Sequence, residues 1–284
     1  MFPHIVIATD LSGYSEQMVD CAGQLQGLSC RKVTLVHVEE ARFSVGLAEA
    51  LAEAHKPELE AQGEKLRSLG FEVSTQIREG IAWYEIVEAA RSSRADLVVV
   101  GSHGYGTLAE SLLGGTAARV VEHSPAPVLL LRMALLESQG RRCSLLCSRA
   151  LEHVLFPTDF SPASEKAAEV MKRLGDRVRR ASLLHVNEET EHLPTDALAA
   201  AQAKDLGRLE ELAKELRAAG CRDVGVEAAR GNPKKVILDR ANADVVTLVV
   251  MGSQGWGVIK DFLMGSVSQT LVRLARVPVL LARG

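Results

Sequence analysis

The feature that most constrains the fold is that the chain carries the same pattern twice. The segment HIVIATDLS at residues 4–12 recurs as HVLFPTDFS at residues 153–161, an offset of 149. The segment PVLLLR at residues 127–132 recurs as PVLLAR at residues 278–283, an offset of 151. Two further pairs lie between them in the same order, LVHVEE with LLHVNEE and VVVGSHGYG with VVMGSQGWG. Such a repeat predicts two homologous domains in one chain.

The length agrees with two domains. A chain of 284 residues holds about two domains of ordinary size. We place the first domain at residues 1–134, a linker at 135–150 and the second domain at 151–284. The linker contains Cys143 and Cys147, and no second His or Cys pair lies nearby. We interpret it as a plain linker with two thiols, and a metal site there is the alternative.

Composition excludes several classes of protein. Hydrophobic residues make up 47% of the chain and aromatic residues only 4%, which predicts aliphatic cores. A net charge of −3 is untypical of nucleic-acid binding, so we expect no nucleic-acid partner. No apolar run has the length of a membrane span, so we expect no membrane partner. The start of the chain lacks the basic region of a signal peptide, and the five scattered cysteines are typical of reduced thiols; both favour a cytoplasmic location.

Short apolar runs alternate with segments of helical spacing. The first repeat predicts strands at residues 5–9, 32–38, 71–77, 96–100 and 128–131. It predicts helices at residues 47–69, 81–92 and 116–122, and a further helix after the first strand, capped by Ser12 or Ser15. The second repeat follows the same pattern. We therefore expect two doubly wound, Rossmann-like α/β domains, each a five-stranded, mostly parallel sheet with helices on both faces.

Glycines cluster after the fourth strand of each repeat. GSHG at residues 101–104 and GSQG at residues 252–255 follow the strand directly. After nine intervening residues, GGT at 114–116 and GSV at 265–267 open a helix. Ligands of open α/β sheets bind beyond the carboxyl ends of the strands, and a helix N-terminus favours an anion. The pattern predicts a phosphate cradle made of backbone N–H groups, with tight turns as the alternative; its presence in both repeats favours the cradle.

Two established phosphate motifs do not match. The P-loop requires a lysine after its last glycine, and neither copy has that lysine. The dinucleotide fingerprint belongs at the first strand–helix turn. Here Gly104, Gly106 and Ala109 have a similar spacing, but they follow the fourth strand, and the second copy has Lys260 at the last position. We therefore expect no NAD site.

These residues resemble the universal stress protein family. The family pattern is G-x-x-G, nine residues and then G-[ST] after the fourth strand, with an acidic residue closing the first strand. Gly252, Gly255, Gly265 and Ser266 match it at every position, and PTDFS at residues 157–161 resembles the opening of the ATP-binding branch. The resemblance covers both domains almost end to end. It implies an adenine nucleotide α-hydrolase-like fold and a nucleotide-binding, regulatory role in the stress response, without established chemistry.

The resemblance also implies which residues hold the nucleotide. In the second domain they are Pro157, Thr158, Asp159, Val186, Met251, Gly252, Gly255, Gly265, Ser266 and Val267. In the first domain they are Asp10, Val38, Val100, Gly101, Gly104, Gly114, Gly115 and Thr116. The ligand would be ATP, or ADP or AMP left by turnover, with Mg²⁺ as a companion ion. For both aspartates, a carboxylate that only caps the turn is the alternative.

The first site is expected to be the weaker one. Gly115 stands where the second domain has Ser266, and Ala8 stands where it has Pro157. Loss of one hydroxyl donor corresponds to roughly 0.5–1.5 kcal/mol, or about three- to tenfold in affinity. Thr116 is a partial substitute. Thr247 replaces Asp96 at the start of the fourth strand, which lies away from the ligand.

The sequence argues against a dedicated active site. His103 lies in the glycine loop, but the better-preserved copy has Gln254 there, so a catalytic histidine is disfavoured. His37 and His185 lie within strands and are interpreted as buried, hydrogen-bonded imidazoles. No metal-ligand spacing stands out. We expect at most weak ATP hydrolysis.

Two other functions stay open. One is a nucleotide-free interaction module, in which both glycine clusters are turns and a dimer face does the work. The resemblance implies that this face is formed by the last strands, 128–131 and 279–281, which would pair antiparallel within the chain as a pseudo-dimer; further pairing into a homodimer is open. The other is an ATP-dependent transferase.

Overall fold

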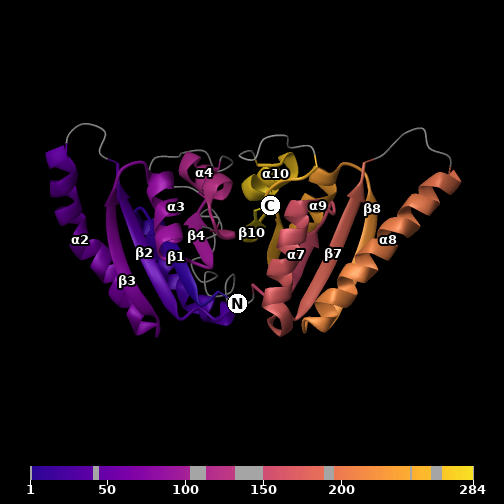
Figure 1. Ribbon diagram of the computed structural model, residues 1–284, viewed down its shortest axis with the longest axis horizontal. Helices are drawn as coiled ribbons and strands as arrows, with labels where there is room; N and C mark the ends of the chain where they lie inside the picture. The colour runs from indigo at the N-terminus through magenta and orange to yellow at the C-terminus, as the bar shows by residue number, and fades with distance from the viewer. Residues whose placement is uncertain are drawn as a thin grey trace. The chain divides into compact units, whose positions relative to one another are not determined.

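The computed structural model describes residues 2–40, 45–102, 113–131, 150–188, 195–243, 245–256 and 264–283 (Figure 1). It divides into two compact units, residues 1–148 and 149–284. Several residues discussed above lie outside the described ranges: His103, Gly104, Gly106, Ala109, Cys143, Cys147 and Lys260, with nearly all of the predicted linker.

The first unit is a parallel five-stranded sheet. Its strands are β1 (His4–Thr9), β2 (Lys32–Glu39), β3 (Glu72–Glu79), β4 (Leu97–Gly101) and β5 (Val128–Leu131). They lie in the order β3-β2-β1-β4-β5, and every neighbouring pair is parallel. The order reverses between β1 and β4, so the carboxyl ends of these strands flank a topological switch point.

The second unit repeats this sheet strand for strand. Its strands are β6 (Val154–Pro157), β7 (Arg180–Asn187), β8 (Asp223–Arg230), β9 (Leu248–Gly252) and β10 (Val279–Ala282). They lie in the order β8-β7-β6-β9-β10, again all parallel. The predicted doubly wound α/β fold is therefore confirmed for both repeats.

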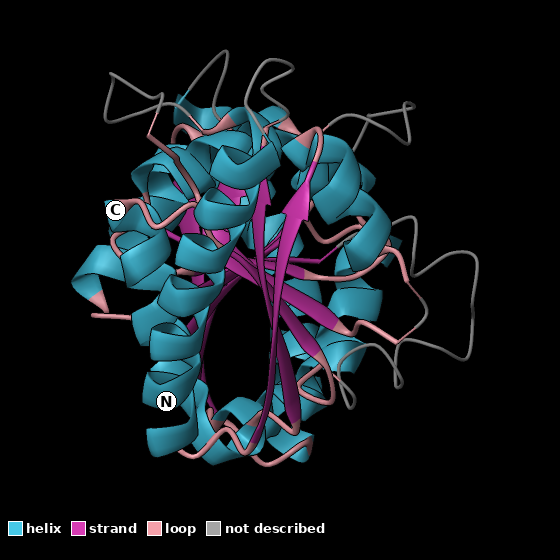
Figure 2. Ribbon diagram, turned by 90° about the vertical axis from the view of Figure 1, so that its right-hand side faces the viewer, coloured by secondary structure: helices cyan, strands magenta, loops and turns pink. Residues whose placement is uncertain are grey.

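Helices cover both faces of each sheet, as Figure 2 shows. In the first unit they are α1 (Gly13–Cys21), α2 (Val45–Ser68), α3 (Ala82–Ser92) and α4 (Gly115–His123). In the second they are α7 (Pro162–Leu174), α8 (Thr195–Ala218), α9 (Pro233–Ala241) and α10 (Ser266–Leu274). Helices α1 and α2 contact each other, and so do α3 and α4; α7 pairs with α8, and α9 with α10. Each pair of helices covers one face.

Local chemistry explains where these elements begin. Ser12 caps α1 and Ser161 caps α7, each accepting a hydrogen bond from the backbone N–H three residues later at 3.3 Å. Leu11 and Phe160, just before the caps, have φ of 60° and 57°, so the chain turns sharply out of each strand. All strand and helix bounds predicted for the first repeat lie within two residues of those observed.

Two short 3₁₀ helices, η1 (Ala22–Leu28) and η2 (Gly175–Arg177), were not predicted. The sequence of η1, AGQLQGL, contains two glycines and no helical apolar stripe, so it resembles a loop.

The cores are largely aliphatic, as predicted. Ile5, Val6 and Ile7 of β1 are fully buried, and Phe156 of β6 is an aromatic exception.

Candidate functional site

The second unit contains a cavity of about 430 Å³ at the carboxyl ends of β6, β7 and β9. The starts of α9 and α10 close it from one face of the sheet. All ten residues predicted for the second site line it: Pro157, Thr158, Asp159, Val186, Met251, Gly252, Gly255, Gly265, Ser266 and Val267. The volume falls in the range of small-molecule sites. Residues from five separate parts of the chain thus meet around one space.

One end of the cavity is formed by the N-terminus of α10. Gly265 is the N-cap and makes no side-chain cap hydrogen bond; its own N–H donates to the Ser253 carbonyl at 2.8 Å. Ser266 and Val267 occupy the first turn, where backbone N–H groups have no partner within the helix. By contrast, the side chain of Asn232 caps α9. The α10 terminus therefore presents N–H donors to the cavity.

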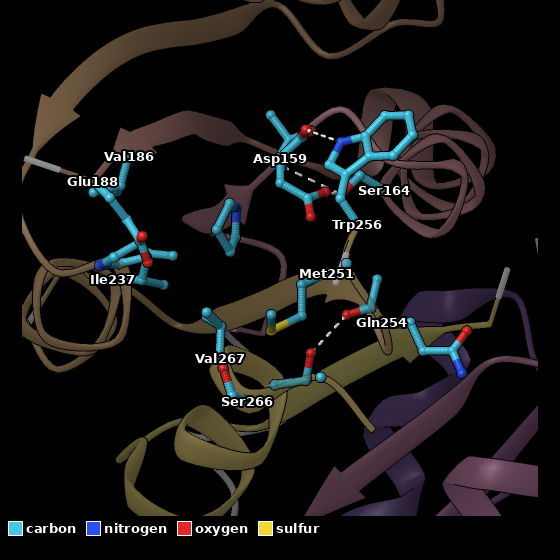
Figure 3. Close-up of a pocket in the computed structure, with 17 residues that line it drawn as sticks. Asp159, Ser164, Val186, Glu188, Ile237, Met251, Gln254, Trp256, Ser266 and Val267 are labelled. Atoms are coloured by element: carbon cyan, nitrogen blue, oxygen red, sulfur yellow. Dashed lines mark hydrogen bonds between the residues drawn. The ribbon is translucent and has the colours of Figure 1, made fainter. Parts of the chain in front are cut away.

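The other side of the cavity is mostly apolar. Figure 3 shows Val186 and Ile237 facing the space from one side and Met251 in its floor. Ser266 and Val267 lie at the α10 end, and Asp159 lies opposite Val186. An apolar wall beside a group of backbone donors suits a ligand with a flat ring at one end and an anion at the other.

Asp159 has two differently placed carboxylate oxygens. Its Oδ1 accepts hydrogen bonds from the Ser161 N–H at 3.0 Å and the Ser164 hydroxyl at 2.7 Å. The turn interpretation therefore applies to this oxygen. Its Oδ2 lies beside Gly255, where an added Cβ would be only 2.5 Å from it. Trp256 donates its ring N–H to the Asp159 carbonyl at 2.9 Å, so the loop after β9 is tied to the end of β6.

The glycines of the motif serve different purposes. A Cβ on Gly252 would lie 2.7 Å from the backbone carbonyl carbon of Ala163, so glycine there allows α7 to pack against the end of β9. A Cβ on Gly265 would lie 3.4 Å from Cα of Gln254, the nearest atom among the described residues, which is close to an ordinary contact. Packing explains Gly252, whereas Gly265 has space for a side chain.

The first unit places its predicted residues in the same way. Asp10 Oδ1 accepts from the Ser12 N–H at 3.1 Å and from the Ser12 hydroxyl at 2.6 Å, and the Ser15 hydroxyl donates to it as well. Gly114 is the N-cap of α4, again without a side-chain cap, and Gly115 and Thr116 are exposed in its first turn. Val38 lies near the end of β2, and Val100 and Gly101 end β4. The eighth residue, Gly104, lies outside the described residues.

The two strand histidines anchor the ends of the first strands. His37 is buried, and its Nδ1 lies 3.0 Å from the Thr9 carbonyl oxygen. His185 is half-buried, and its Nδ1 lies 2.7 Å from the Thr158 carbonyl oxygen. Both are hydrogen-bonded, as predicted, although only His37 is fully buried.

Two cysteine thiols are well placed to be unreactive. Cys30 and Cys221 are free and buried. Burial raises the pKa of the Cys30 thiol to about 12 and also raises the pKa of Cys221. Both therefore stay protonated at neutral pH.

Among the helices in the described ranges, none is long and apolar enough to cross a membrane.

Seven further residues line the cavity and were not predicted: Ser164, Glu188, Pro233, Ile237, Gln254, Trp256 and Ser268. Glu188 lies two residues after Val186, so strand alternation would have indicated it. Trp256 and Gln254 are neighbours of Gly255 in the chain, so the glycine motif could also have predicted them. Ile237 comes from α9, and no local signal in the sequence links that helix to the glycine clusters.

The comparisons with known proteins agree with the fold. The model of the universal stress protein family matches residues 1–132 and again 150–283. A universal stress protein of Mycolicibacterium smegmatis is 29% identical over 310 residues, covering 98% of this chain and 96% of that protein. One from Mycobacterium tuberculosis is 33% identical over 198 residues, covering 68% of this chain and 63% of that protein.

Among solved structures, a universal stress protein from Archaeoglobus fulgidus superimposes with a TM-score of 0.79 at 21% identity. The match covers 100% of this chain and 99% of that one, so the likeness extends over both repeats of the fold. The chain therefore belongs to the universal stress protein family, and it carries the family's domain twice.

Proposed function

We propose that the second unit binds an adenine nucleotide, ATP first of all, and that the chain is a nucleotide-binding regulatory protein of the stress response. The observation that carries the proposal is the cavity beyond β6, β7 and β9, which combines an apolar wall with an uncapped helix N-terminus. ADP or AMP left by turnover fits the same chemistry, with Mg²⁺ as the counter-ion of the phosphates.

The α10 end of the cavity suits the phosphates. Ser266 and Val267 offer backbone N–H groups, and Ser266 adds a hydroxyl. The helix dipole contributes roughly 0.3–1 kcal/mol per charge at such a terminus. The apolar side chains of Val186, Ile237 and Met251 suit the adenine ring. The turn hydrogen bonds of Asp159 go to Oδ1, so we assign Oδ2 to the hydroxyls of a ribose.

The second site is proposed as the stronger one. Both helix starts have a glycine N-cap without a side-chain cap, so the backbone donors are common to the two units. The difference is the next residue, Ser266 in α10 and Gly115 in α4. One hydroxyl hydrogen bond to a phosphate is the expected advantage of the second site.

Regulation is favoured over catalysis. No histidine is among the described residues that line the cavity, and Gln254 occupies the loop position of His103. We keep weak ATP hydrolysis by positioning alone as the upper limit of activity.

From the family resemblance we also propose an intramolecular pseudo-dimer through the last strand of each repeat. From the cysteine usage we propose a cytoplasmic location.

The decisive experiment is calorimetry of the full chain with ATP and Mg²⁺. Gly265→Val should weaken binding at least about tenfold, because a branched side chain at the N-cap obstructs the approach of phosphate. The variant is expected to fold, since Gly265 has φ of −62° and space for a Cβ. Gly114→Val, at the matching position of the first unit, is the control and should leave the stronger site unchanged.

Fluorescence can assign the site. The chain has two tryptophans, Trp83 in α3 and Trp256 at the cavity. In a Trp83→Phe background, the emission of Trp256 should change on addition of ATP and not on addition of inorganic sulfate at equal ionic strength. Absence of binding heat, together with no adenine nucleotide released by denaturing the purified protein, would instead favour the nucleotide-free interaction module.

A further inference from the structure

Three potential metal ligands meet in the first unit, and none of them is among the residues assigned to nucleotide binding. His37 and Glu39 are two residues apart on β2, so their side chains leave the same face of the strand. His55 reaches them from α2. His37 Nε2 lies 3.1 Å from Glu39 Oε1, and His55 Nδ1 lies 2.5 Å from the same oxygen. All three ligand atoms lie within 4.8 Å of one another.

The backbone determines the tautomer of His37. Its Nδ1 lies 3.0 Å from the carbonyl oxygen of Thr9. A carbonyl oxygen only accepts, so Nδ1 carries the hydrogen, and Nε2 of the neutral ring bears a lone pair. This lone pair points at a carboxylate oxygen, which is also an acceptor. A lone pair that faces a negatively charged carboxylate oxygen attracts a cation between them, either a proton or a metal ion.

The same set of atoms has the composition of a metal site. Two imidazoles and one carboxylate form a standard ligand set for zinc, with one further position left to water. Metal–ligand bonds of about 2.0–2.2 Å place neighbouring ligand atoms of a tetrahedral site about 3.4 Å apart. The separation of His37 and Glu39 is already close to this value. Only His55 has to retreat by about 1 Å, and its side chain is 37% exposed whereas those of His37 and Glu39 are each 9% exposed.

We propose that His37, Glu39 and His55 bind a divalent transition-metal ion of the zinc class. The Thr9 carbonyl is the outer-shell group that orients the His37 ring, a role commonly played by backbone carbonyls at metal-bound histidines. The two buried ligands come from a rigid strand, and the more exposed one closes the site from the helix. Water reaches the ion past His55.

The proposed metal site lies on the opposite face of the sheet from the glycine clusters. In β7, Val186 lines the nucleotide cavity, so its neighbours His185 and Asn187 point to the other face. The register of β2 against β1 repeats that of β7 against β6, which places His37 and Glu39 on the face covered by α1 and α2. A metal ion here is therefore not the companion ion of a nucleotide phosphate.

The second unit supplies a natural control. The residues matching His37, Glu39 and His55 are His185, Asn187 and Asp205. Asn187 donates its amide N–H to Asp205 Oδ2 at 2.6 Å, and its Oδ1 lies 3.3 Å from His185 Nε2. His185 Nε2 also faces an oxygen, but that oxygen belongs to a neutral amide, which is a poor ligand for zinc. The amide hydrogen of Asn187 already fills the contact between strand and helix. The proposal therefore assigns one ion to each chain, not two.

The test is a titration of the full chain, stripped with EDTA, with Zn²⁺ alone. Calorimetry should show one ion bound, and His55→Asn should weaken its binding at least about tenfold. His55 is half-exposed on a helix, so this variant should fold. Asp205→Asn in the second unit and the double variant Cys143→Ser with Cys147→Ser should bind as the wild type does.

A second readout separates this site from thiol ligation. Co²⁺ bound to two imidazoles and a carboxylate gives visible d–d bands without thiolate charge-transfer absorption, and Glu39→Gln should abolish these bands. A wild-type chain that takes up no Zn²⁺ would show that protons alone bridge the three groups and would overturn the proposal. Equal binding by wild type and His55→Asn, or a thiolate spectrum with Co²⁺, would overturn it as well.

Discussion

The two units have the same backbone and different side chains at the ends of their strands. Both sheets have the same strand order, both first helices are capped by a serine, and both second strands place a histidine on the carbonyl of the first. They differ in the residue after the N-cap glycine, Gly115 against Ser266. The two repeats share the features that the fold needs, and they differ in the chemistry at the ends of their strands.

The divergence concerns both faces of the sheet. On the face of α9 and α10, the second unit has the additional hydroxyl of Ser266. On the face of α1 and α2, the first unit has a carboxylate between two imidazoles, where the second unit has an amide. We therefore expect the two units to bind different ligands best, nucleotide in the second and metal ion in the first.

The largest expected effect comes from transferring the metal site. Asn187→Glu combined with Asp205→His recreates the ligand set around His185, whose Nδ1 already faces the Thr158 carbonyl. Calorimetry with Zn²⁺ should then show two bound ions where the wild type binds one. Asn187→Gln with Asp205→His is the matched control, and it should leave the stoichiometry at one. If the double Glu/His variant gains no second ion while the wild type binds one, the ligand set alone does not explain the difference between the units.

A smaller effect is expected for the stability of the second unit. Gly252→Ala should lower its free energy of unfolding by about 1–3 kcal/mol, because the new Cβ meets the backbone of Ala163. Denaturant unfolding followed by Trp256 emission in a Trp83→Phe background measures this loss of stability.

Gly115→Ala is the contrasting change in the first unit. No described residue has an atom within 4 Å of a Cβ there, and the residue is helical, so a gain of about 0.4–1 kcal/mol is expected. Equal losses in both variants would mean that the packing against α7 is unimportant.

Exchange of the helix-start residues should change affinity by a similar or smaller amount. Ser266→Gly should weaken ATP binding to the second unit about three- to tenfold, and Gly115→Ser should strengthen binding to the first unit by a similar factor. In the part of the chain that the structure describes, the Cβ of a serine at 115 meets no atom within 4 Å. Calorimetry on each single variant and on the double exchange tests both directions. No change in either variant would remove the hydroxyl from the explanation of which site is stronger.

The smallest expected effect is a pH dependence that both units share. Burial lowers the pKa of His4, and the positive charge of Lys32 lowers it further. The negative charges of Asp96 and Glu72 raise this pKa and oppose the shift in part. Burial and then Arg180 likewise lower the pKa of His153. The folded state therefore binds fewer protons than the unfolded state below the ordinary histidine value of 6.5.

It follows that the free energy of unfolding should be highest above about pH 6.5 and should fall as the pH decreases below that value. The neutral imidazoles contact Thr34 and Ser182 through Nε2, at 2.9 and 2.8 Å. His4→Gln and His153→Gln keep a polar group near these hydroxyls and should each flatten the pH profile. Urea unfolding at a series of pH values measures the slope. A steeper profile in either variant would contradict the assigned direction of the shift.

Much of the fold was predictable because its causes are local. Runs of buried β-branched residues, serine caps and glycine stops determine where elements begin and end, and the internal repeat doubles the evidence for each. The ten residues predicted for the second site were also within reach, since they lie at strand ends and at one helix start. Parallel strands bring such ends together whatever the details of packing.

The sequence by itself thus determined the two α/β units, the order of their elements and the strand ends at which polar groups gather. Only the tertiary structure decided which distant side chains join them. Ile237 reaches the cavity of the second unit because α9 packs against β7, and His55 reaches Glu39 in the first unit because α2 packs against β2. The physical reason is that such meetings depend on the rotation of a helix against its sheet. Packing of the whole core sets that rotation, and no short segment of sequence encodes it.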